Sequence, residues 1–203
     1  KIYDNSSEQV FYAEPKKRNK FYNLAVYFTE LKHYPVTMEL AAGSNLISFN
    51  SIVSDTSLDH IFKPIENEAI AIIGQSVGSN YYNDEWIGTI EAINYTDGYW
   101  LVVSDSVTFD TYGYPIDELP SNPISYDLTN IDTEGNLISW PSNYDITVSD
   151  AIPNEVESLF KGIFANGMAA QQIDSNWYGS LTHFEGNKGY WLFISEPIES
   201  FSF

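Results

Sequence analysis

One pentapeptide has the form that activates a nucleophilic serine. Gly74-Gln75-Ser76-Val77-Gly78 matches G-x-S-x-G and follows an apolar stretch, as a nucleophile elbow does. An elbow must lead into a helix, whose first amides help to form the oxyanion hole, but residues 79–85 show no helical pattern. His183 is the only histidine after this serine. We therefore keep a serine hydrolase using Ser76 as the weakest hypothesis, and we predict no catalytic residues and no enzymatic activity.

A second segment resembles half of a calcium loop. Asn130, Asp132 and Glu134 place oxygen ligands at alternate positions before a glycine, but Pro141 stands where the closing glutamate should be. The segment is better interpreted as a turn, with these three residues as weak metal candidates. The chain has no cysteine and only three separated histidines, so a zinc site has no ligand set. We predict no cofactor and leave a weak calcium site open.

Aromatic side chains are the remaining candidates for a binding surface. Four tryptophans could act as sugar-stacking platforms, because a flat ring covers the apolar face of a pyranose: Trp86, Trp100, Trp177 and Trp191. Each lies in a repeated block between strand-like neighbours, which favours a place in the core. Four tyrosines that are not repeated are weak ligand-binding candidates, since tyrosine suits interfaces: Tyr81, Tyr82, Tyr112 and Tyr114.

The tryptophans belong to an internal duplication. Gly98-Tyr99-Trp100-Leu101 recurs as Gly189-Tyr190-Trp191-Leu192, at an offset of 91 residues. The same offset relates two further pairs of blocks: NLISF at 45–49 with NLISW at 136–140, and WIG at 86–88 with WYG at 177–179. Three blocks in one order and at one spacing indicate two copies of a single structural unit.

Periodicity predicts the elements that position these residues. In the first copy, short apolar or alternating runs predict strands at 36–40, 46–49, 69–73, 86–93 and 99–103. Between them, Ser54-Asp55-Thr56 predicts the start of a helix. Its buried face consists of residues at i, i+3, i+4 and i+7: Leu58, Ile61, Phe62 and Ile65. Pro64 is expected to end or kink this helix.

The second copy predicts the same plan with different loop lengths. Residues 124–128 correspond to the first strand, and the loop after them is three residues longer. A helical face is predicted at an offset of 98 rather than 91: Val156, Leu159, Phe160 and Ile163. We therefore predict a mostly β (α+β) fold of two tandem copies of a β-rich unit, each with about five strands and one short helix.

The predicted domain organisation follows from these elements. Residues 1–35 form an N-terminal arm with a first strand at 21–28, and residues 36–104 form the first repeat unit. Residues 105–123 form a proline-containing linker with an edge strand. The second repeat unit and the C-terminal tail occupy 124–203, and the apolar tail is expected to be a strand completed elsewhere.

Composition limits the classes of function. With 43% hydrophobic and 16% aromatic residues, the chain of 203 residues can bury a sizeable core. The net charge of −19 repels nucleic acid, although residues 1–20 hold five of the nine basic residues and could be a basic arm. No apolar run approaches the roughly 18–20 residues of a membrane span, so we predict no membrane insertion. The missing initiator Met predicts a processed chain or a piece of a longer one.

The repeated blocks resemble short modules of bacterial surface and secreted proteins and of phage structural proteins. Their pattern is a leucine, Gly-x-Asn-Leu-Ile-Ser, a short helix, a lone tryptophan and then Gly-Tyr-Trp, and the resemblance covers about 36–104 and 124–195. This chain departs from it by lacking a tryptophan after Gly43 and by having Glu134-Gly135 before the second Asn-Leu-Ile-Ser. The resemblance implies a non-catalytic structural or adhesive module and transfers no functional residues.

Our first hypothesis is therefore a non-enzymatic structural or adhesive module of a virion or bacterial surface assembly. Its partners would be proteins of that assembly, including copies of itself, and its location would be extracellular. The second hypothesis is a carbohydrate-binding module of a larger secreted protein, with a glycan as partner. Exposed coplanar aromatic rings on one face would favour the second hypothesis, and a helix after Ser76 would favour the hydrolase.

Overall fold

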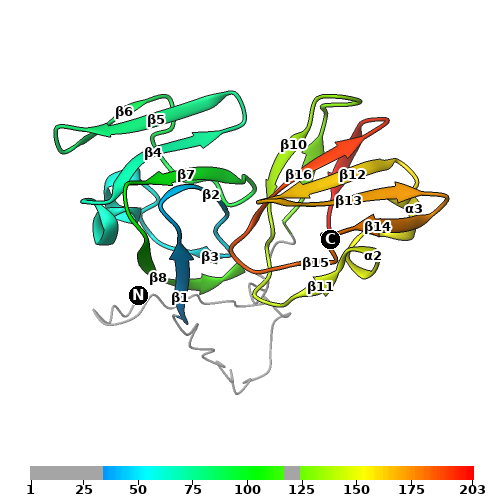
Figure 1. The fold of residues 1–203 in the computed structure, drawn as a ribbon, viewed down its shortest axis with the longest axis horizontal. Coiled ribbons are helices and arrows are strands. Elements are labelled where there is room, and N and C mark those ends of the chain that lie inside the picture. Colours follow the sequence, from blue (N-terminus) through cyan, green and yellow to red (C-terminus); the bar gives the residue numbers. More distant parts are fainter. Residues whose placement is uncertain (1–33, 117–123) are drawn as a thin grey trace, which may run out of the picture. The chain divides into compact units, whose positions relative to one another are not determined.

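The computed structural model describes residues 34–116 and 124–203 (Figure 1). These ranges are called the first copy and the second copy below. The predicted arm at 1–20, the predicted strand at 21–28 and residues 117–123 of the predicted linker lie outside the described residues.

Each copy is built on a five-stranded antiparallel sheet. In the first copy the spatial order is β2 (Gly43–Ile47), β7 (Tyr99–Val103), β4 (Ala69–Gly74), β5 (Val77–Tyr82) and β6 (Glu85–Gly88). In the second copy it is β10 (Asn136–Ser139), β16 (Gly189–Ile194), β12 (Phe160–Ala165), β13 (Met168–Ile173) and β14 (Asn176–Gly179). The two orders are the same, so the mostly β fold in two copies is confirmed.

Smaller sheets complete each copy. The first copy adds β1 (Tyr34–Leu40), β8 (Val107–Pro115) and β3 (Ser51–Ile52) in the order β1-β8-β3. The second copy adds β17 (Ile198–Phe201) paired with β9 (Tyr126–Leu128), and β11 (Ile146–Thr147) paired with β15 (His183–Phe184). Its helices are α2 (Val148–Ala151) and α3 (Asn154–Glu157), where the first copy has α1 (Leu58–Ile61) and the 3₁₀ turn η1 (Lys63–Ile65).

Each copy has its own hydrophobic core. In the first copy, Phe49 makes edge-to-face contacts with Phe62 and Phe109, at centroid separations of 6.2 and 6.5 Å. In the second copy, Trp140 stands in place of Phe49 and stacks on Phe184 at 4.9 Å. The copies therefore bury separate sets of aromatic side chains.

The predicted buried face of the first copy's helix is confirmed, but its predicted start at Ser54-Asp55-Thr56 is wrong: α1 begins after Ser57, whose side chain makes no capping hydrogen bond. All four residues of its predicted face are buried, in α1 and η1. Pro64 lies inside η1, where the α-helix has already ended. Two one-turn helices thus present the same apolar face that a single short helix was expected to present.

The predicted helical face of the second copy is wrong. Phe160 and Ile163 lie in β12, and the helical turns are α2 and α3 before it. A β-bulge between Phe160 and Gly162 shifts the alternation of β12, so that Phe160 and Ile163 both point into the core. The bulge therefore gives the buried residues of a strand the i, i+3 spacing of a helix. β12 is the counterpart of β4, and the offset between these two strands is 91 and not 98.

Two segments near the predicted boundaries belong to the cores. Residues 105–123 were predicted as a linker with an edge strand, but β8 within them lies between β1 and β3 and is the central strand of that sheet. Its Phe109 is fully buried in the first core. The C-terminal tail forms β17, which pairs with β9 of the same copy, Ile198 opposite Leu128. The tail strand therefore pairs within the second copy.

The repeated asparagines and tyrosines hold turns. Asn45 accepts a hydrogen bond from Ala41 N at 2.9 Å and donates to its carbonyl at 2.8 Å. Asn136 makes the equivalent bonds in the turn before β10. The Tyr99 hydroxyl accepts from Asn94 N, and the Tyr190 hydroxyl accepts from Glu185 N. Burial raises the pKa of both phenols well above the ordinary value, so they stay neutral.

The repeated serines join the two copies. Ser48 N donates to Asn187 O at 3.0 Å, and Ser139 N donates to Thr96 O at the same distance. Single β-bridges link Ile47 with Lys188 and Asp97 with Ile138. In each pair, shifting the residues of one contact by 91 positions gives the residues of the other contact. The interface is therefore isologous, which means that each copy contributes the same patch to it.

The repeated glycines lie in the same contact. A Cβ on Gly98 would be 2.6 Å from the Ile138 carbonyl oxygen, and one on Gly189 would be 2.7 Å from the Ile47 carbonyl oxygen. Leu46 and Leu137 are buried beside them, at 3% and 4% exposure. Part of the repeated Asn-Leu-Ile-Ser and Gly-Tyr-Trp blocks therefore forms this contact between the copies and does not pack within one core.

Two of the predicted core tryptophans are not core residues. Trp100 and Trp191 are half-buried, and alternation places them on the faces of β7 and β16 opposite Tyr99, Leu101, Tyr190 and Leu192. Trp86 and Trp177 are half-buried and pack against the edges of the two cores. The fully buried tryptophan is Trp140, at 1% exposure, which was not among the four.

No helix in the described part of the chain has the length and apolar character needed to cross a bilayer.

Candidate functional site

Ser76 lies at a hairpin turn. It stands between β4 and β5 with a φ of 62°, it is exposed, and the chain after it enters a strand and not a helix. His183 lies in β15 of the other copy, where its Nδ1 is 2.9 Å from Thr182 Oγ1. The strand–turn–helix arrangement that a nucleophile elbow requires is not formed here.

The motif has a structural use instead. The side-chain oxygen of Gln75 accepts a hydrogen bond from Leu137 N at 2.8 Å, so the β4–β5 hairpin contacts β10 of the second copy. In the second copy the position of Ser76 is taken by Gly167, with a φ of 73°. The glycine–serine sequence of the motif is a turn that also contributes to the contact between copies.

Replacing Ser76 by glycine is expected to stabilise the chain. Glycine adopts a positive φ without the steric cost that serine has, an advantage of up to about 1 kcal/mol. Thermal and urea unfolding of Ser76→Gly and wild type would measure this change. A loss of stability would contradict the assignment of Ser76 to a simple turn.

The segment resembling a calcium loop is held by internal contacts. Asp132 forms an ion pair with Lys161, and its backbone N donates to Ile194 O at 2.8 Å. Asn130 donates through its side chain to Gly135 O, and Glu134 N donates to Ile131 O. The described residues contain no group of three or more His, Cys, Asp or Glu side chains placed to hold a metal ion.

The four candidate tyrosines do not form one site. Tyr112 and Tyr114 lie on β8, where Tyr112 is exposed and Tyr114 is half-buried. Tyr82 is 65% exposed at the end of β5. Tyr81 lines a pocket together with Trp86, one of the four tryptophans predicted to lie in the core.

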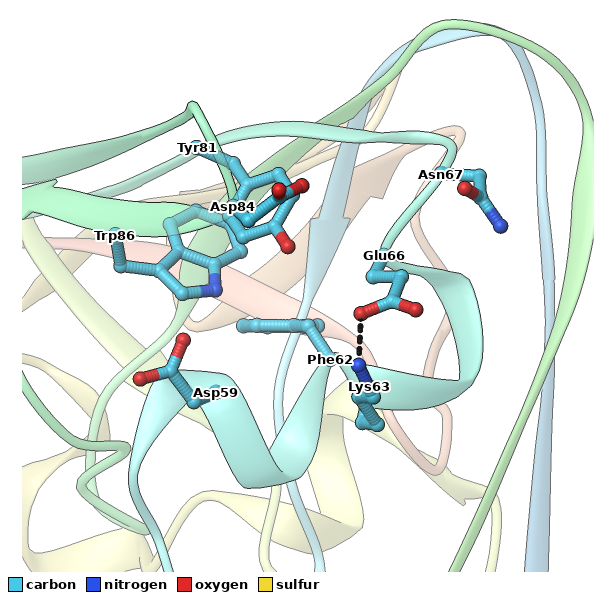
Figure 2. Close-up of a pocket in the computed structure, with 8 residues that line it drawn as sticks. All are labelled: Asp59, Phe62, Lys63, Glu66, Asn67, Tyr81, Asp84 and Trp86. Carbon is cyan, nitrogen blue, oxygen red and sulfur yellow. Dashed lines mark hydrogen bonds and ion pairs between the residues drawn. The ribbon is translucent and has the colours of Figure 1, made fainter.

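This pocket of the first copy has a volume of about 580 Å³. It lies between the α1–η1 segment and the β5–β6 hairpin (Figure 2). Its lining combines three aromatic rings with charged and amide groups: Asp59, Phe62, Lys63, Glu66, Asn67, Tyr81, Asp84 and Trp86. Sequence analysis found Tyr81 here but not the acidic residues, because α1, η1 and the hairpin bring them together only in the fold.

The aromatic rings form a continuous wall. The Trp86 ring lies 5.4 Å from Phe62 and 5.2 Å from Tyr81, centroid to centroid, with interplanar angles of 47° and 48°. Phe62 is 1% exposed and supports the wall from the core side. Since Tyr81 and Trp86 are half-buried, part of each ring is accessible from the pocket.

Polar groups surround this wall. Figure 2 shows the Asp59 carboxylate on the same side of the pocket as the Trp86 indole nitrogen, and the Lys63–Glu66 ion pair away from it. Partial burial, and then the charges of Glu66 and Asp84, raise the pKa of the Tyr81 phenol, so that it stays a hydrogen-bond donor. The hydrogen bond to Glu66 raises the pKa of Lys63 and keeps it charged.

At the equivalent place in the second copy, hydrogen bonds join residues across the groove. Glu157, the counterpart of Glu66, accepts a hydrogen bond from Trp177 Nε1 at 2.8 Å. Gln172, the counterpart of Tyr81, donates through its side chain to the Glu157 backbone oxygen at 2.8 Å. In the first copy, Glu66 pairs with Lys63 instead, and the Trp86 indole N–H has no hydrogen-bond partner within the described part of the chain.

A second groove lies on the outer face of the second sheet, opposite its core. Its volume is about 500 Å³, and its lining includes Phe164, Tyr178 and Phe193. Phe164 and Phe193 meet edge to face at 5.1 Å, so these rings are not coplanar. The Asp132–Lys161 ion pair forms part of its edge.

No known protein family, curated protein or solved structure matches this chain.

Proposed function

We propose that the chain is a non-enzymatic adhesive module of a bacterial surface or virion assembly, and that the pocket of the first copy holds its ligand. The observation that carries this proposal is the difference between the copies. In the second copy Glu157 accepts a hydrogen bond from the tryptophan indole N–H, whereas in the first copy the equivalent indole lines a pocket and has no protein partner among the described residues. The Trp86 indole N–H is not among the buried unpaired atoms of the described residues, so it is accessible from the pocket and can donate to a ligand in place of water. Departures of this kind concentrate at functional sites.

The lining of the pocket suits binding better than catalysis. The described lining contains no serine, threonine, cysteine or histidine. Its groups able to transfer protons are the carboxylates of Asp59, Glu66 and Asp84, and Glu66 is held in an ion pair by Lys63. They do combine apolar ring surface with a few polar groups, which is the usual composition of small-ligand sites. Ser76 and His183, the residues of the hydrolase hypothesis, lie outside this lining.

A structural role in an assembly is the second candidate, and the outer sheet faces favour it. Several large apolar side chains there are more than 40% exposed: Ile73 and Ile87 in the first copy, and Phe164 and Tyr178 in the second. Contiguous exposed apolar surface commonly marks a contact with another protein. Another molecule of the same chain is a partner that could bind to both outer faces.

The adhesive role predicts binding to cell surfaces through the pocket. The labelled full chain is expected to stain intact bacterial or host cells in flow cytometry, and Asp59→Asn is expected to reduce the staining severalfold. Asp59 is exposed on α1, so this change removes a ligand contact without disturbing the core. The matched control is Asp150→Asn, at the equivalent exposed position of α2, which should stain like wild type.

The same experiment separates the two candidates. A chain that stains no surface, yet associates with itself in light scattering, would contradict the adhesive role and favour the structural one. Staining that is equal in all three proteins would place the adhesive surface outside this pocket.

A further inference from the structure

The pocket has the chemistry of a sugar site, and we infer that its ligand is a neutral pyranose of a surface glycan. This inference rests on the proposed adhesive function and names the ligand class for the same pocket. The volume of about 580 Å³ lies within the range of roughly 300–1,000 Å³ that is usual for small-ligand sites.

The ring surfaces provide the apolar half of such a site. A pyranose presents C–H groups on one face, and burying them against an aromatic ring removes apolar surface from water. The wall of Trp86 and Tyr81, backed by Phe62, offers this surface. Because Phe62 is buried and packed against Trp86, the wall is held in place before a ligand arrives.

Hydrogen-bonding groups around the wall provide the polar half. Trp86 Nε1 and the Tyr81 hydroxyl are donors, and the Asp59 and Asp84 carboxylates are acceptors. Asn67 offers both kinds of group. Sugar hydroxyls donate and accept at once, so neighbouring hydroxyls can use donors and acceptors together.

Two other ligand classes fit less well. An acidic sugar or a phosphate would be repelled by three carboxylates in the lining and by a chain with net charge −19. A quaternary ammonium would use the ring faces, but it makes no hydrogen bonds and would leave Trp86 Nε1 unpaired. It would also lie near the Lys63 ammonium, which stays charged.

Lys63 is the positioning residue of this site. It holds Glu66 in an ion pair at the edge of the pocket. The second copy has Asn154 at the position of Lys63, and there the glutamate bonds the tryptophan. Lys63 therefore keeps the Trp86 indole N–H available to a ligand.

The experiment uses the full chain on an array of neutral, acidic and amine-bearing glycans. The chain is then titrated with choline, with sialyllactose and with methyl glycosides of the neutral hexoses that bind on the array. Neutral glycans are expected to bind, and Trp86→Phe, which keeps a ring but removes the N–H, should weaken binding at least tenfold. Trp177→Phe is the matched change in the second copy and should leave binding unchanged.

Lys63→Asn tests the positioning role with a readout that folding alone would not move. It is expected to weaken binding about tenfold and to slow hydrogen exchange of the Trp86 indole N–H, because Glu66 would then accept from it. Thermal stability should hardly change, since exposed ion pairs contribute little. Lys63→Arg keeps the ion pair with Glu66 and should bind as tightly as wild type.

Each outcome decides something. Pocket-dependent binding of choline would overturn the neutral pyranose and leave the adhesive role standing. Neutral-glycan binding that Trp86→Phe and Asp59→Asn do not weaken would overturn the site. Binding to none of these probes, together with cell staining that depends on Asp59, would overturn the pyranose alone. Binding to neither probes nor cells would overturn the adhesive role as well.

Discussion

Replacing Trp140 by alanine is expected to lower the free energy of unfolding by about 3–5 kcal/mol, because a large buried ring leaves a cavity that the core cannot fill. Trp140 is 1% exposed, stacks on Phe184 and meets the edge of Phe203 at 4.9 Å. Its indole N–H donates to Tyr144 O at 3.0 Å. No other tryptophan of the chain is buried as fully.

The comparison with Trp100→Ala and Trp191→Ala gives this prediction its control. Both rings are half-buried on the outer sheet faces, so less apolar area returns to water and each change should cost about 1–2 kcal/mol. Urea unfolding followed by circular dichroism measures all three variants. Equal losses for Trp100→Ala and Trp140→Ala would contradict the placement of Trp100 outside the core.

Alanine at Gly98 or Gly189 is expected to destabilise the chain by about 1–3 kcal/mol, as overpacking does at tight contacts. The added methyl group would meet backbone carbonyl oxygens of the other copy, and backbone cannot move aside as a flexible side chain can. The two glycines also approach each other, since a Cβ on Gly189 would be 3.3 Å from Gly98 Cα. The two substitutions should therefore not be additive.

Gly78→Ala is the matched control for this pair. Gly78 lies in β5 of the first copy, and its nearest neighbour would be 3.4 Å from an added Cβ, which is an ordinary contact. Its thermal unfolding should stay within about 0.5 kcal/mol of wild type. If Gly98→Ala were as mild as Gly78→Ala, the close contact between the copies would be disproved.

The repeat predicted the architecture because identical blocks must fill identical environments. Asn45 and Asn136 show the principle, since both pin the turn before the second strand. The blocks could not show which residues face the partner copy. A serine such as Ser48, buried at 0% exposure, has the same sequence signal whether its hydrogen bond crosses a sheet or an interface.

The local pattern failed where the backbone is irregular. Phe160 and Ile163 have helical spacing because a bulge interrupts the strand, and no residue in the sequence marks that bulge unambiguously. The pentapeptide around Ser76 matches a catalytic motif. The position of Ser76 in a two-residue turn becomes evident when it is aligned with Gly167 of the second copy.

The candidate site was only partly accessible from sequence. Tyr81 was identified because the second copy lacks a tyrosine there, and this asymmetry was the useful signal. Trp86 was assigned to the core because it is repeated, although its counterpart Trp177 differs from it in hydrogen bonding. The second copy has Asn154 where the first has Lys63, and this difference decides whether the indole N–H is available to a ligand. The role of Lys63 could not be predicted from sequence, because it depends on Glu66 lying beside it in the fold.

Hydrogen exchange of the indole N–H groups, followed by NMR on the chain without ligand, tests the central claim most directly. Trp177 and Trp140 donate to Glu157 Oε1 and Tyr144 O, so their signals should exchange slowly. Trp86 should exchange fast, with its signal assigned through Trp86→Phe. Exchange of Trp86 as slow as that of Trp177 would show that its indole N–H is hydrogen-bonded too, and the proposed ligand site would be lost.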